Sequence, residues 1–246
     1  MRARLDAEMA RRGLAESRQT AQRLIMAGRV RVNSRPANKA DLKVDGDAEI
    51  ELVGAASEFA SRGAHKLIAA LEHFHIDVAG ARALDVGAST GGFTDVLLRR
   101  GAANVIALDV GYGQLADKLR RDPRVTILDR TNIREVAPGE LPYRPNLVVI
   151  DASFISLKLI IPAVLKLIDE PARIVALIKP QFEVGKGKVG KGGVVRDGAL
   201  RTKTVVGVVE FIRGRGLEVV GTLKSPITGA AGNIEHLAYL RTRRPN

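Results

Sequence analysis

Four ionisable side chains stand at the ends of predicted helices and strands, where folding could bring them together: Lys66, Asp151, Lys179 and Glu235. Lysines and carboxylates that share one site can remove the proton of a hydroxyl group and stabilise the negative charge left on its oxygen. Two ordinary surface salt bridges would use the same residue types. The residues by themselves therefore leave a catalytic and a structural interpretation open.

A glycine-rich turn, 87–92, could hold a ligand next to these side chains. It follows an apolar stretch that contains Asp85, and a helical spacing of apolar residues begins after it at Phe93. The next apolar stretch ends at Asp109, about 20 residues beyond the first glycine, where an acid can bind both hydroxyls of a ribose. Because the spacing G-x-x-x-G-G is not the dinucleotide pattern G-x-G-x-x-G, we expect an adenosine-like ligand without a pyrophosphate. A structural turn without any ligand is the alternative.

A mostly parallel sheet must position these residues, because short apolar strands alternate with helical patterns from residue 82 onward. The predicted strands are 82–86, 104–108, 125–128, 147–150, 173–178, 217–224 and 236–241, and we expect the last two to be antiparallel. The predicted helices include 62–74, 114–121, 157–168 and 199–214. Open α/β sheets bind ligands at the carboxyl ends of their strands, so the four ionisable side chains and the glycine turn should share one crevice. Asp129, Thr131 and Asn132 could flank an adenine there, or could form an ordinary turn.

The composition points to a polyanionic partner. The chain has 246 residues, a formal net charge of +12 and a pI of about 10.4. No apolar run reaches the roughly 20 residues of a membrane span, and no apolar signal-peptide region follows the N-terminus. The absence of cysteine excludes disulfides, thiol catalysis and cysteine zinc clusters. We therefore expect a cytoplasmic protein that binds nucleic acid and no metal.

The positive charge is concentrated at the N-terminus, where Met1 to Lys39 hold ten basic and three acidic residues. Apolar spacing predicts two helices, the second capped by Ser17 and ended by Gly28. The alternating stretches 29–33 and 48–53 predict two short strands.

This arrangement resembles the S4 RNA-binding domain over roughly Arg2 to Val53, with matches that include Ser17, Gly28 and Asn33. The resemblance implies contacts to phosphates, which provide affinity and salt dependence more than sequence choice. The residues implied in RNA binding are Arg4, Arg11, Arg18, Arg23, Arg29, Arg31, Arg35 and, beyond this domain, Arg62. A solvated helical face is the alternative, because runs of charge usually have that role.

Five separated motifs follow one another along the chain: S-R-G-x-x-K-L, D-V-G-x-S-T-G-G-F-T-D, D-x-S-F-I-S-L, K-P-Q-F-E-V-G and G-N-x-E. With these motifs the chain resembles the TlyA (hemolysin A) family of FtsJ-type ribosomal RNA 2′-O-methyltransferases. The resemblance implies a Rossmann-like, S-adenosylmethionine-dependent methyltransferase sheet behind a small α+β S4-like domain. It gives Lys179 the central catalytic role, with Lys66, Asp151 and Glu235 in support. The S-adenosylmethionine contacts that it implies are Asp85, Gly87, Ser89, Thr90, Gly91, Gly92, Phe93, Asp109, Val110, Asp129, Thr131, Asn132 and Asp151.

The two resemblances predict an S4-like domain at 1–56, a linker at 57–62 and a methyltransferase domain at 63–246. Ala64 and His65 depart from the residues usual beside the family's first catalytic lysine, but the four ionisable residues themselves all match.

A second glycine-rich stretch, 185–193, follows Lys179. It resembles a P-loop, but Gly192 stands where Ser or Thr must reach magnesium, so we reject an NTPase. The lysines of this stretch that we expect to contact an RNA backbone are Lys186, Lys188 and Lys191. A flexible loop that is basic by chance is the alternative.

The sequence therefore favours an S-adenosylmethionine-dependent 2′-O-methyltransferase of ribosomal RNA, with cytidine in the 16S or 23S molecule as the target that the resemblance implies. The expected partner is ribosomal RNA or a ribosomal subunit, and we expect a monomer. A noncatalytic RNA-binding or ribosome-assembly factor is the second hypothesis. The membrane-lytic activity suggested by the family's older name is the third, but no spanning or strongly amphipathic lytic segment is found.

Overall fold

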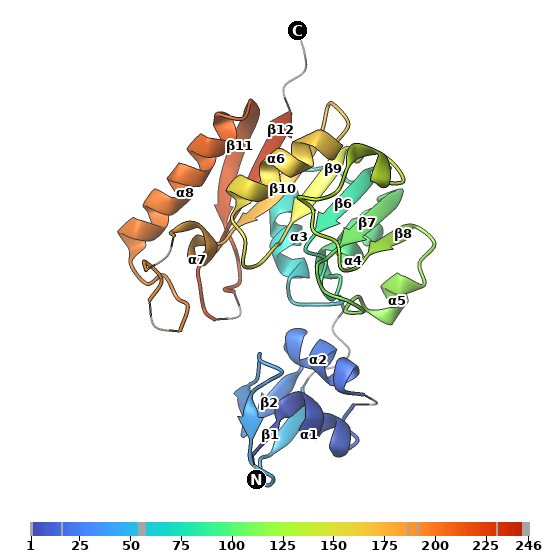
Figure 1. The fold of residues 1–246 in the computed structure, drawn as a ribbon, viewed down its shortest axis with the longest axis vertical. Coiled ribbons are helices and arrows are strands. Elements are labelled where there is room, and N and C mark those ends of the chain that lie inside the picture. The colour runs from blue at the N-terminus through green and yellow to red at the C-terminus, as the bar shows by residue number, and fades with distance from the viewer. Residues whose placement is uncertain are drawn as a thin grey trace.

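A seven-stranded sheet forms the centre of the larger part of the molecule, in the order β11-β12-β10-β9-β6-β7-β8 (Figure 1). The computed structural model describes residues 2–15, 17–53, 58–185, 187–190, 192–229 and 231–242. The strands of the sheet are β6 (Arg82–Val86), β7 (Asn104–Leu108), β8 (Val125–Leu128), β9 (Leu147–Ile150), β10 (Arg173–Ile178), β11 (Leu217–Lys224) and β12 (His236–Thr242). Strand β12 is antiparallel to both neighbours, and the strands from β10 to β8 are parallel.

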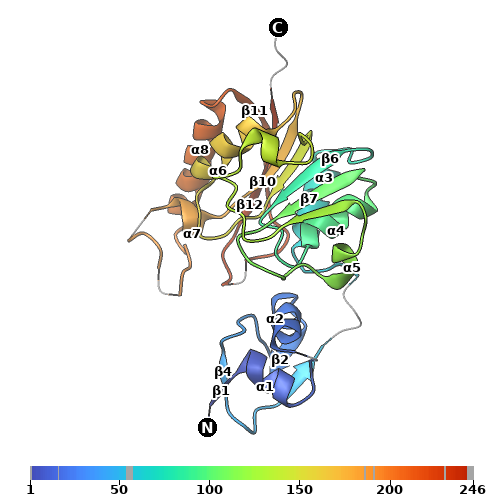
Figure 2. The same ribbon diagram turned by 45° about the vertical axis from the view of Figure 1, so that its right-hand side comes forward.

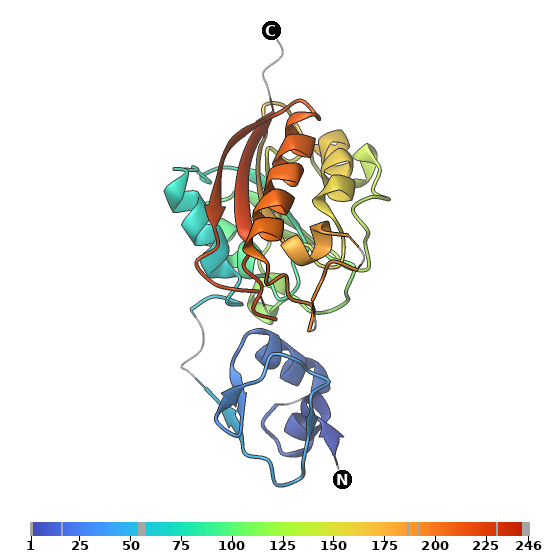
Figure 3. The same ribbon diagram turned by 90° about the vertical axis from the view of Figure 1, so that its left-hand side faces the viewer.

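Helices cover both faces of this sheet (Figures 2 and 3). One face packs against α3 (Ala64–His73), α4 (Gly92–Arg99) and α5 (Asp117–Arg120), and the other against α6 (Leu157–Leu167) and α8 (Gly198–Arg213). Between these layers β9 is buried along its whole length, as its unbroken Leu-Val-Val-Ile sequence predicts for a parallel strand covered on both sides. Two short elements complete this part, the 3₁₀ helix η1 (Pro138–Glu140) and α7 (Pro180–Glu183).

The register of β12 against β10 determines where the last motif lies. His236 pairs with Ile178, so the residue before β12 and the residue after β10 reach the same edge of the sheet. These two residues are Glu235 and Lys179. The same edge receives the carboxyl ends of β6, β7 and β9, because all three run parallel to β10.

The N-terminal part has its own core and small sheets. Its elements are β1 (Ala3–Arg4), α1 (Leu5–Arg11), α2 (Arg18–Met26), β2 (Val30–Val32), β3 (Arg35–Pro36), β4 (Lys43–Val44) and β5 (Ile50–Leu52). Leu5, Met9 and Ile25 are fully buried in this core, which explains the helical spacing of apolar residues on α1 and α2. Helix α2 contacts the larger part directly, since Gln19 Nε2 donates a 2.8 Å hydrogen bond to the carbonyl of Gly113.

The predicted fold class, an α/β methyltransferase-type sheet behind a small α+β domain, is confirmed. All seven strands of the sheet were predicted within one residue at each end, and β11 and β12 are antiparallel as expected. The predicted helix 114–121 is shorter, because only 117–120 is helical. The short strands β1, β3 and β4 and helix α7 were not predicted, since segments of two to four residues carry too little periodicity. The predicted linker at 57–62 begins outside the described residues, and the domain boundaries stay a prediction.

Candidate active site

The four ionisable side chains form one row of alternating charges. Lys66 Nζ donates a 2.7 Å hydrogen bond to Glu235 Oε2 and lies 3.9 Å from Asp151 Oδ2. Lys179 Nζ lies 2.6 Å from Asp151 Oδ1 in an ion pair. Asp151 thus stands between the two lysines, and the structure brings together all four residues that the sequence singled out.

Burial distinguishes this row from surface salt bridges. The side chains of Lys66 and Lys179 are each 9% exposed, and that of Glu235 is 2% exposed. A charge removed from water costs several kcal/mol unless an opposite charge and hydrogen bonds compensate for it. The alternation of signs provides that compensation here. Solvated surface pairs would not need it, so the interpretation as two surface salt bridges does not fit this arrangement.

Each member of the row lies at or next to the end of a helix or strand, which fixes its position. Lys66 lies in the first turn of α3, Asp151 and Lys179 directly follow β9 and β10, and Glu235 directly precedes β12. Gly229 leaves the space that Glu235 occupies, because a Cβ at this glycine would lie 2.4 Å from Glu235 Oε1. Any other residue at position 229 would therefore displace the carboxylate.

The amine of Lys179 is fixed more closely than the sequence indicated. Its Nζ donates a 2.9 Å hydrogen bond to Ser153 Oγ and a longer one, 3.4 Å, to the backbone carbonyl of Asp151. The ion pair with Asp151 Oδ1 lacks hydrogen-bond geometry, so Ser153 is the closest hydrogen-bond acceptor of this amine. Sequence reasoning missed Ser153, although it lies in the D-x-S-F-I-S-L motif.

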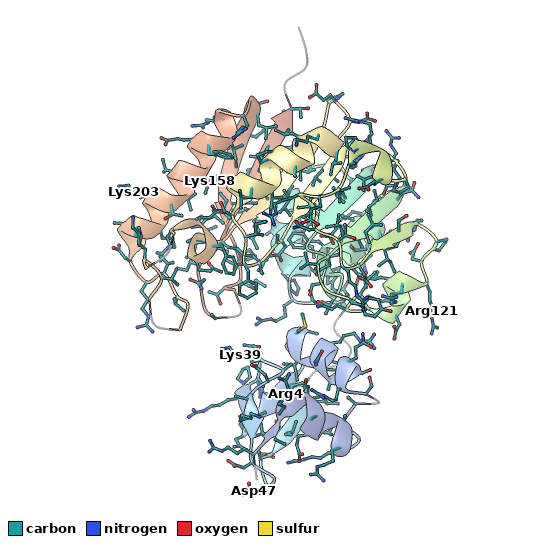
Figure 4. The ribbon with its side chains drawn as sticks, viewed as in Figure 1. Arg4, Lys39, Asp47, Arg121, Lys158 and Lys203 are labelled. Carbon is teal, nitrogen blue, oxygen red and sulfur yellow. The ribbon has the colours of Figure 1, made fainter. Side chains whose placement is uncertain are left out.

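A cleft of about 540 Å³ opens beside the row of charges. All four ionisable residues line it, together with Gly87, Ser89, Thr90, Gly92 and Phe93 of the glycine turn. The N-terminal part also contributes, through Met26, Asn38 and Lys39. Lys39 lies on the side of the N-terminal part that faces the larger part (Figure 4). The cleft therefore lies between the two parts of the chain.

The glycine turn has the tight geometry that its sequence predicts. Gly87 has a φ of +87°, and a Cβ there would lie 2.9 Å from the carbonyl oxygen of Asp151. Only glycine combines this left-handed conformation with so close an approach to the end of β9. Gly91, also left-handed at φ +94°, is the residue before α4 and does not line the cleft.

Asp85 is completely buried beneath this turn and is incompletely paired. Thr94 Oγ1 donates a 2.7 Å hydrogen bond to its Oδ2, while Oδ1 has no hydrogen-bond partner among the described residues. Burial raises the pKa of Asp85 to about 7, and the hydrogen bond from Thr94 opposes part of this rise. A buried carboxylate oxygen without a partner can accept a hydrogen bond from a positively charged group of a ligand.

Asp109 is held by two backbone donors, Ser89 N at 2.8 Å and Gly111 N at 2.7 Å. Each carboxylate oxygen keeps a second acceptor position, so the side chain can still bind two hydroxyl groups. Val110 beside it is 72% exposed and offers an apolar surface next to the Asp109 carboxylate.

The three residues predicted to flank the adenine have partners elsewhere. Asp129 accepts from Gly113 N, Thr131 Oγ1 donates to the carbonyl of Asp129, and Asn132 Nδ2 donates to Glu135. None of the three lines the cleft, nor do Asp85, Asp109 and Val110. Their contact with a cofactor stays a prediction.

The arginines predicted to bind RNA fall into two groups. Carboxylates of α1 already hold several of them: Asp6 accepts from Arg4 and Arg18, and Glu8 accepts from Arg11. These bonds lower the pKa of Asp6, and they lower that of Glu8 to about 2. Arg23 is also paired, 3.1 Å from Asp117 across the two parts of the chain.

A second group of predicted arginines is exposed. Arg31 and Arg35 lie in the β2–β3 hairpin, and no ion pair or hydrogen bond of either side chain is found among the described residues. Arg62 lines the cleft, and its side chain lies against Gly28. The remaining predicted arginine, Arg29, belongs to neither group, because it is partly buried and has an interaction of its own within the protein.

The predicted basic loop can be followed only in part. Lys188 is exposed, whereas Lys186 and Lys191 lie outside the described residues. Gly192 and Gly193 of this loop line the cleft. No group of three or more His, Cys, Asp or Glu side chains that could hold a metal ion is found in the described part of the chain.

An aromatic side chain that sequence reasoning did not single out projects at the mouth of the cleft. Phe154 is 91% exposed, although it lines the cleft, and its backbone has a φ of +64°. Its ring lies 5.1 Å from that of Phe182. An apolar ring exposed to water and a non-glycine residue at positive φ both cost stability, and both features are typical of functional residues. The motif D-x-S-F-I-S-L was the only sequence signal for it.

Two family models match the chain, S4 domain at residues 3–50 and FtsJ-like methyltransferase at residues 59–242. The chain is 53% identical over 243 residues to the 16S/23S rRNA (cytidine-2′-O)-methyltransferase TlyA of Mycobacterium tuberculosis, covering 98% of this chain and 91% of that protein. It is 37% identical to the 23S rRNA (cytidine-2′-O)-methyltransferase TlyA of Campylobacter jejuni, covering 74% and 70%. A solved structure, "Putative hemolysin from Streptococcus thermophilus", aligns with a TM-score of 0.77 at 41% identity, covering 99% of this chain and 89% of the other.

Proposed function

The chain belongs to the TlyA family of FtsJ-like methyltransferases, and we propose that it transfers a methyl group from S-adenosylmethionine to the 2′-hydroxyl of a cytidine in ribosomal RNA. The observation that carries this proposal is the buried row Lys66, Glu235, Asp151 and Lys179 at the wall of a cleft that also contains the glycine turn. Both named relatives are cytidine-2′-O-methyltransferases, one of 16S and 23S RNA and the other of 23S RNA. They agree on the ribose of cytidine and differ on the RNA molecule.

Lys179 is the residue placed to act on the substrate hydroxyl. Its amine faces the cleft, held by Asp151 and Ser153. A ribose hydroxyl is a weak nucleophile, so the enzyme must align it and stabilise the alkoxide that forms as its proton leaves. Lys179 can accept that proton when neutral, or stabilise the alkoxide when charged. Asp151 keeps the amine in position, and the Lys66–Glu235 pair keeps Asp151 in position in turn.

The residues present fit S-adenosylmethionine. Asp85 does not line the cleft, but its buried Oδ1 has no hydrogen-bond partner among the described residues, and such an oxygen suits the ammonium group of the methionine part. Asp109 has free acceptor positions for the two hydroxyls of the ribose, and Val110 offers an apolar surface nearby. When bound, the cofactor supplies an electrophilic methyl group. The chain's own part is to hold the hydroxyl in line with that group and to exclude water from it.

The cleft suits a single nucleotide taken out of an RNA helix. Phe154 is an exposed ring at its mouth, and a base can stack on such a ring. Lys39 and Arg62 line the same cleft and can contact phosphates on either side of the nucleotide. A ribose in a duplex cannot easily reach a buried row of charges, so extrusion of the target nucleotide is expected.

A ribosomal substrate places the enzyme in the cytoplasm. No helix in the described part of the chain is long and apolar enough to cross a membrane. Liposomes loaded with a dye should therefore stay intact in the presence of the purified protein, which tests the membrane-lytic alternative.

The proposal is tested by incubating the purified chain with labelled S-adenosylmethionine and unmodified ribosomal subunits, and mapping the labelled ribose. Lys179→Ala should lose about 10²-fold or more of the methyl transfer, since general acid–base groups contribute 10²–10⁴-fold, while RNA binding is kept. Lys158→Ala, at an exposed position of α6 (Figure 4), serves as the matched control. Absence of label with both subunits would favour the noncatalytic assembly factor. Undiminished transfer by Lys179→Ala would remove this lysine from the mechanism.

A further inference from the structure

The side chain of Asn233 joins two loops that border the substrate cleft. Asn233 is 2% exposed, and both ends of its amide are hydrogen bonded. Its Nδ2 donates to the carbonyl of Gly193 at 2.8 Å, and its Oδ1 accepts from the backbone N–H of Val195 at 3.0 Å. The orientation of the amide is fixed by these partners, because a carbonyl can only accept and an N–H can only donate.

Asn233 itself lies in the loop that precedes β12 and leads to Glu235 of the active site. Its carbonyl accepts a 2.9 Å hydrogen bond from Gly229 N, and the chain reaches Glu235 two residues later. Gly229 is also the residue that leaves space for the Glu235 carboxylate. Asn233 therefore connects the position of one loop to a member of the row of charges.

The loop that contains Gly193 and Val195, the two partners of the Asn233 side chain, forms a wall of the cleft. Gly192 and Gly193 line it, and Gly190 pairs with Val194, which lies between the two positions that Asn233 anchors, Gly193 and Val195. Gly192 and Gly193 both have a positive φ, and glycine adopts many backbone conformations, so this segment has little conformational preference of its own. Its position relative to the cleft must come from contacts with the rest of the chain. The two bonds from Asn233 are side-chain contacts of this kind.

We propose that Asn233 is a positioning residue that holds the Gly192–Gly193 segment against the cleft, and so sets the width of the entrance for the RNA nucleotide. The inference rests on the proposed function, because it concerns binding of RNA at that site. Among the described residues Asn233 makes no hydrogen bond to the glycine turn or to Lys179, so its effect should be specific to RNA and spare S-adenosylmethionine. Asn233 itself lines the cleft, but both polar ends of its amide are already hydrogen bonded, to Gly193 and to Val195.

The test compares Asn233→Asp with Asn104→Asp, the same chemical change at an exposed position at the start of β7. Asn233→Asp replaces the donor to Gly193 by an oxygen that faces a carbonyl oxygen, so the segment should move away. We expect the KM for ribosomal subunits to rise roughly tenfold or more, since small misplacements at an active site have effects of this size. The affinity for S-adenosylmethionine, by calorimetry, should stay within about twofold. Trypsin should cleave Asn233→Asp between residues 185 and 196 several times faster than the wild type.

Two outcomes would overturn the proposal. An unchanged KM for subunits together with faster cleavage would show that the position of this segment does not matter to RNA. A parallel loss of affinity for S-adenosylmethionine and RNA would show that Asn233 only supports the fold. If Asn233→Asp does not fold, Asn233→Ala, which adds no charge, replaces it in the same measurements. If the wild type transferred no methyl group, the proposed function would fail, but RNA dissociation constants of the wild type and the variants would still test the role of Asn233.

Discussion

Lys66 Nζ and Glu235 Oε2 lie 2.7 Å apart, although 169 positions separate the two residues in the chain. Helix α3 supplies the lysine before the first strand of the large sheet, and the acid stands before the last strand, β12. The pair therefore forms only when the first and last elements of this sheet are both in place. A buried ion pair of this kind is expensive to break, because removal of one partner leaves an uncompensated charge.

Glu235→Gln should lower the free energy of unfolding by about 3–5 kcal/mol, since it leaves the buried Lys66 ammonium with only the more distant carboxylate of Asp151, at 3.9 Å, among the described residues. The double variant Lys66→Met and Glu235→Gln should be less destabilised than the sum of the two single variants, because it leaves no unpaired charge. Urea unfolding of all four proteins measures this coupling. Additive losses would show that the two residues do not act as a pair.

Asp85 should make the stability of the ligand-free protein depend on pH. Burial raises its pKa from 3.8 to about 7, so between these values the folded state keeps a proton that the unfolded state has lost. Stability should therefore fall as the pH rises from about 4 to about 7, by at most about 1.4 kcal/mol per pH unit. Asp85→Asn, which cannot ionise, should lack this contribution.

The measurement is urea unfolding of the wild type and Asp85→Asn at several pH values from 5 to 8. The difference in stability should shift in favour of Asp85→Asn as the pH rises. Parallel curves for the two proteins would contradict a raised pKa of Asp85. The same variant should bind S-adenosylmethionine more weakly at pH 8, where the Asp85 carboxylate is charged, and the difference should shrink towards pH 5, where the wild-type carboxyl is itself neutral.

Phe154→Ala should weaken methyl transfer without weakening the fold. The ring is 91% exposed, so its removal takes away little buried surface. If a base stacks on it, the loss is about 1–3 kcal/mol of RNA binding, or roughly tenfold to a hundredfold in kcat/KM. Leu159→Ala, an exposed apolar residue on α6, is the control. An unchanged kcat/KM for subunits would show that no base stacks on Phe154.

The sequence predicted the centre of the large sheet well because β9 and β10 contain continuous apolar stretches of at least four residues. It also indicated the four ionisable residues, because each lies next to the end of an element whose position follows from the sheet. It could not give Ser153 or Asn233 a role. Their importance comes from hydrogen bonds to Lys179 and Gly193, 26 and 40 positions away, which no local pattern records.

The same limit applies to the N-terminal arginines. Charge and spacing placed them together, but only the structure separates those held by carboxylates from those that are exposed. Arg11 is bound to Glu8 through two hydrogen bonds, whereas Arg31 and Arg35 have no such partner among the described residues. The free guanidinium groups lose no internal partner when they meet a phosphate, so they should contribute more to RNA binding than Arg11.

Arg31→Ala and Arg35→Ala should each weaken RNA binding and reduce the slope of log Kd against log salt concentration by about 1. Arg11→Ala should change this slope less, because its guanidinium is already neutralised by Glu8. Filter binding of a ribosomal RNA fragment between 50 and 200 mM salt, the range over which phosphate contacts weaken strongly, measures all three variants. An equal change of slope for Arg11→Ala and Arg31→Ala would mean that Arg11 leaves Glu8 and binds RNA itself. The β2–β3 hairpin would then contribute no more to RNA binding than α1 does.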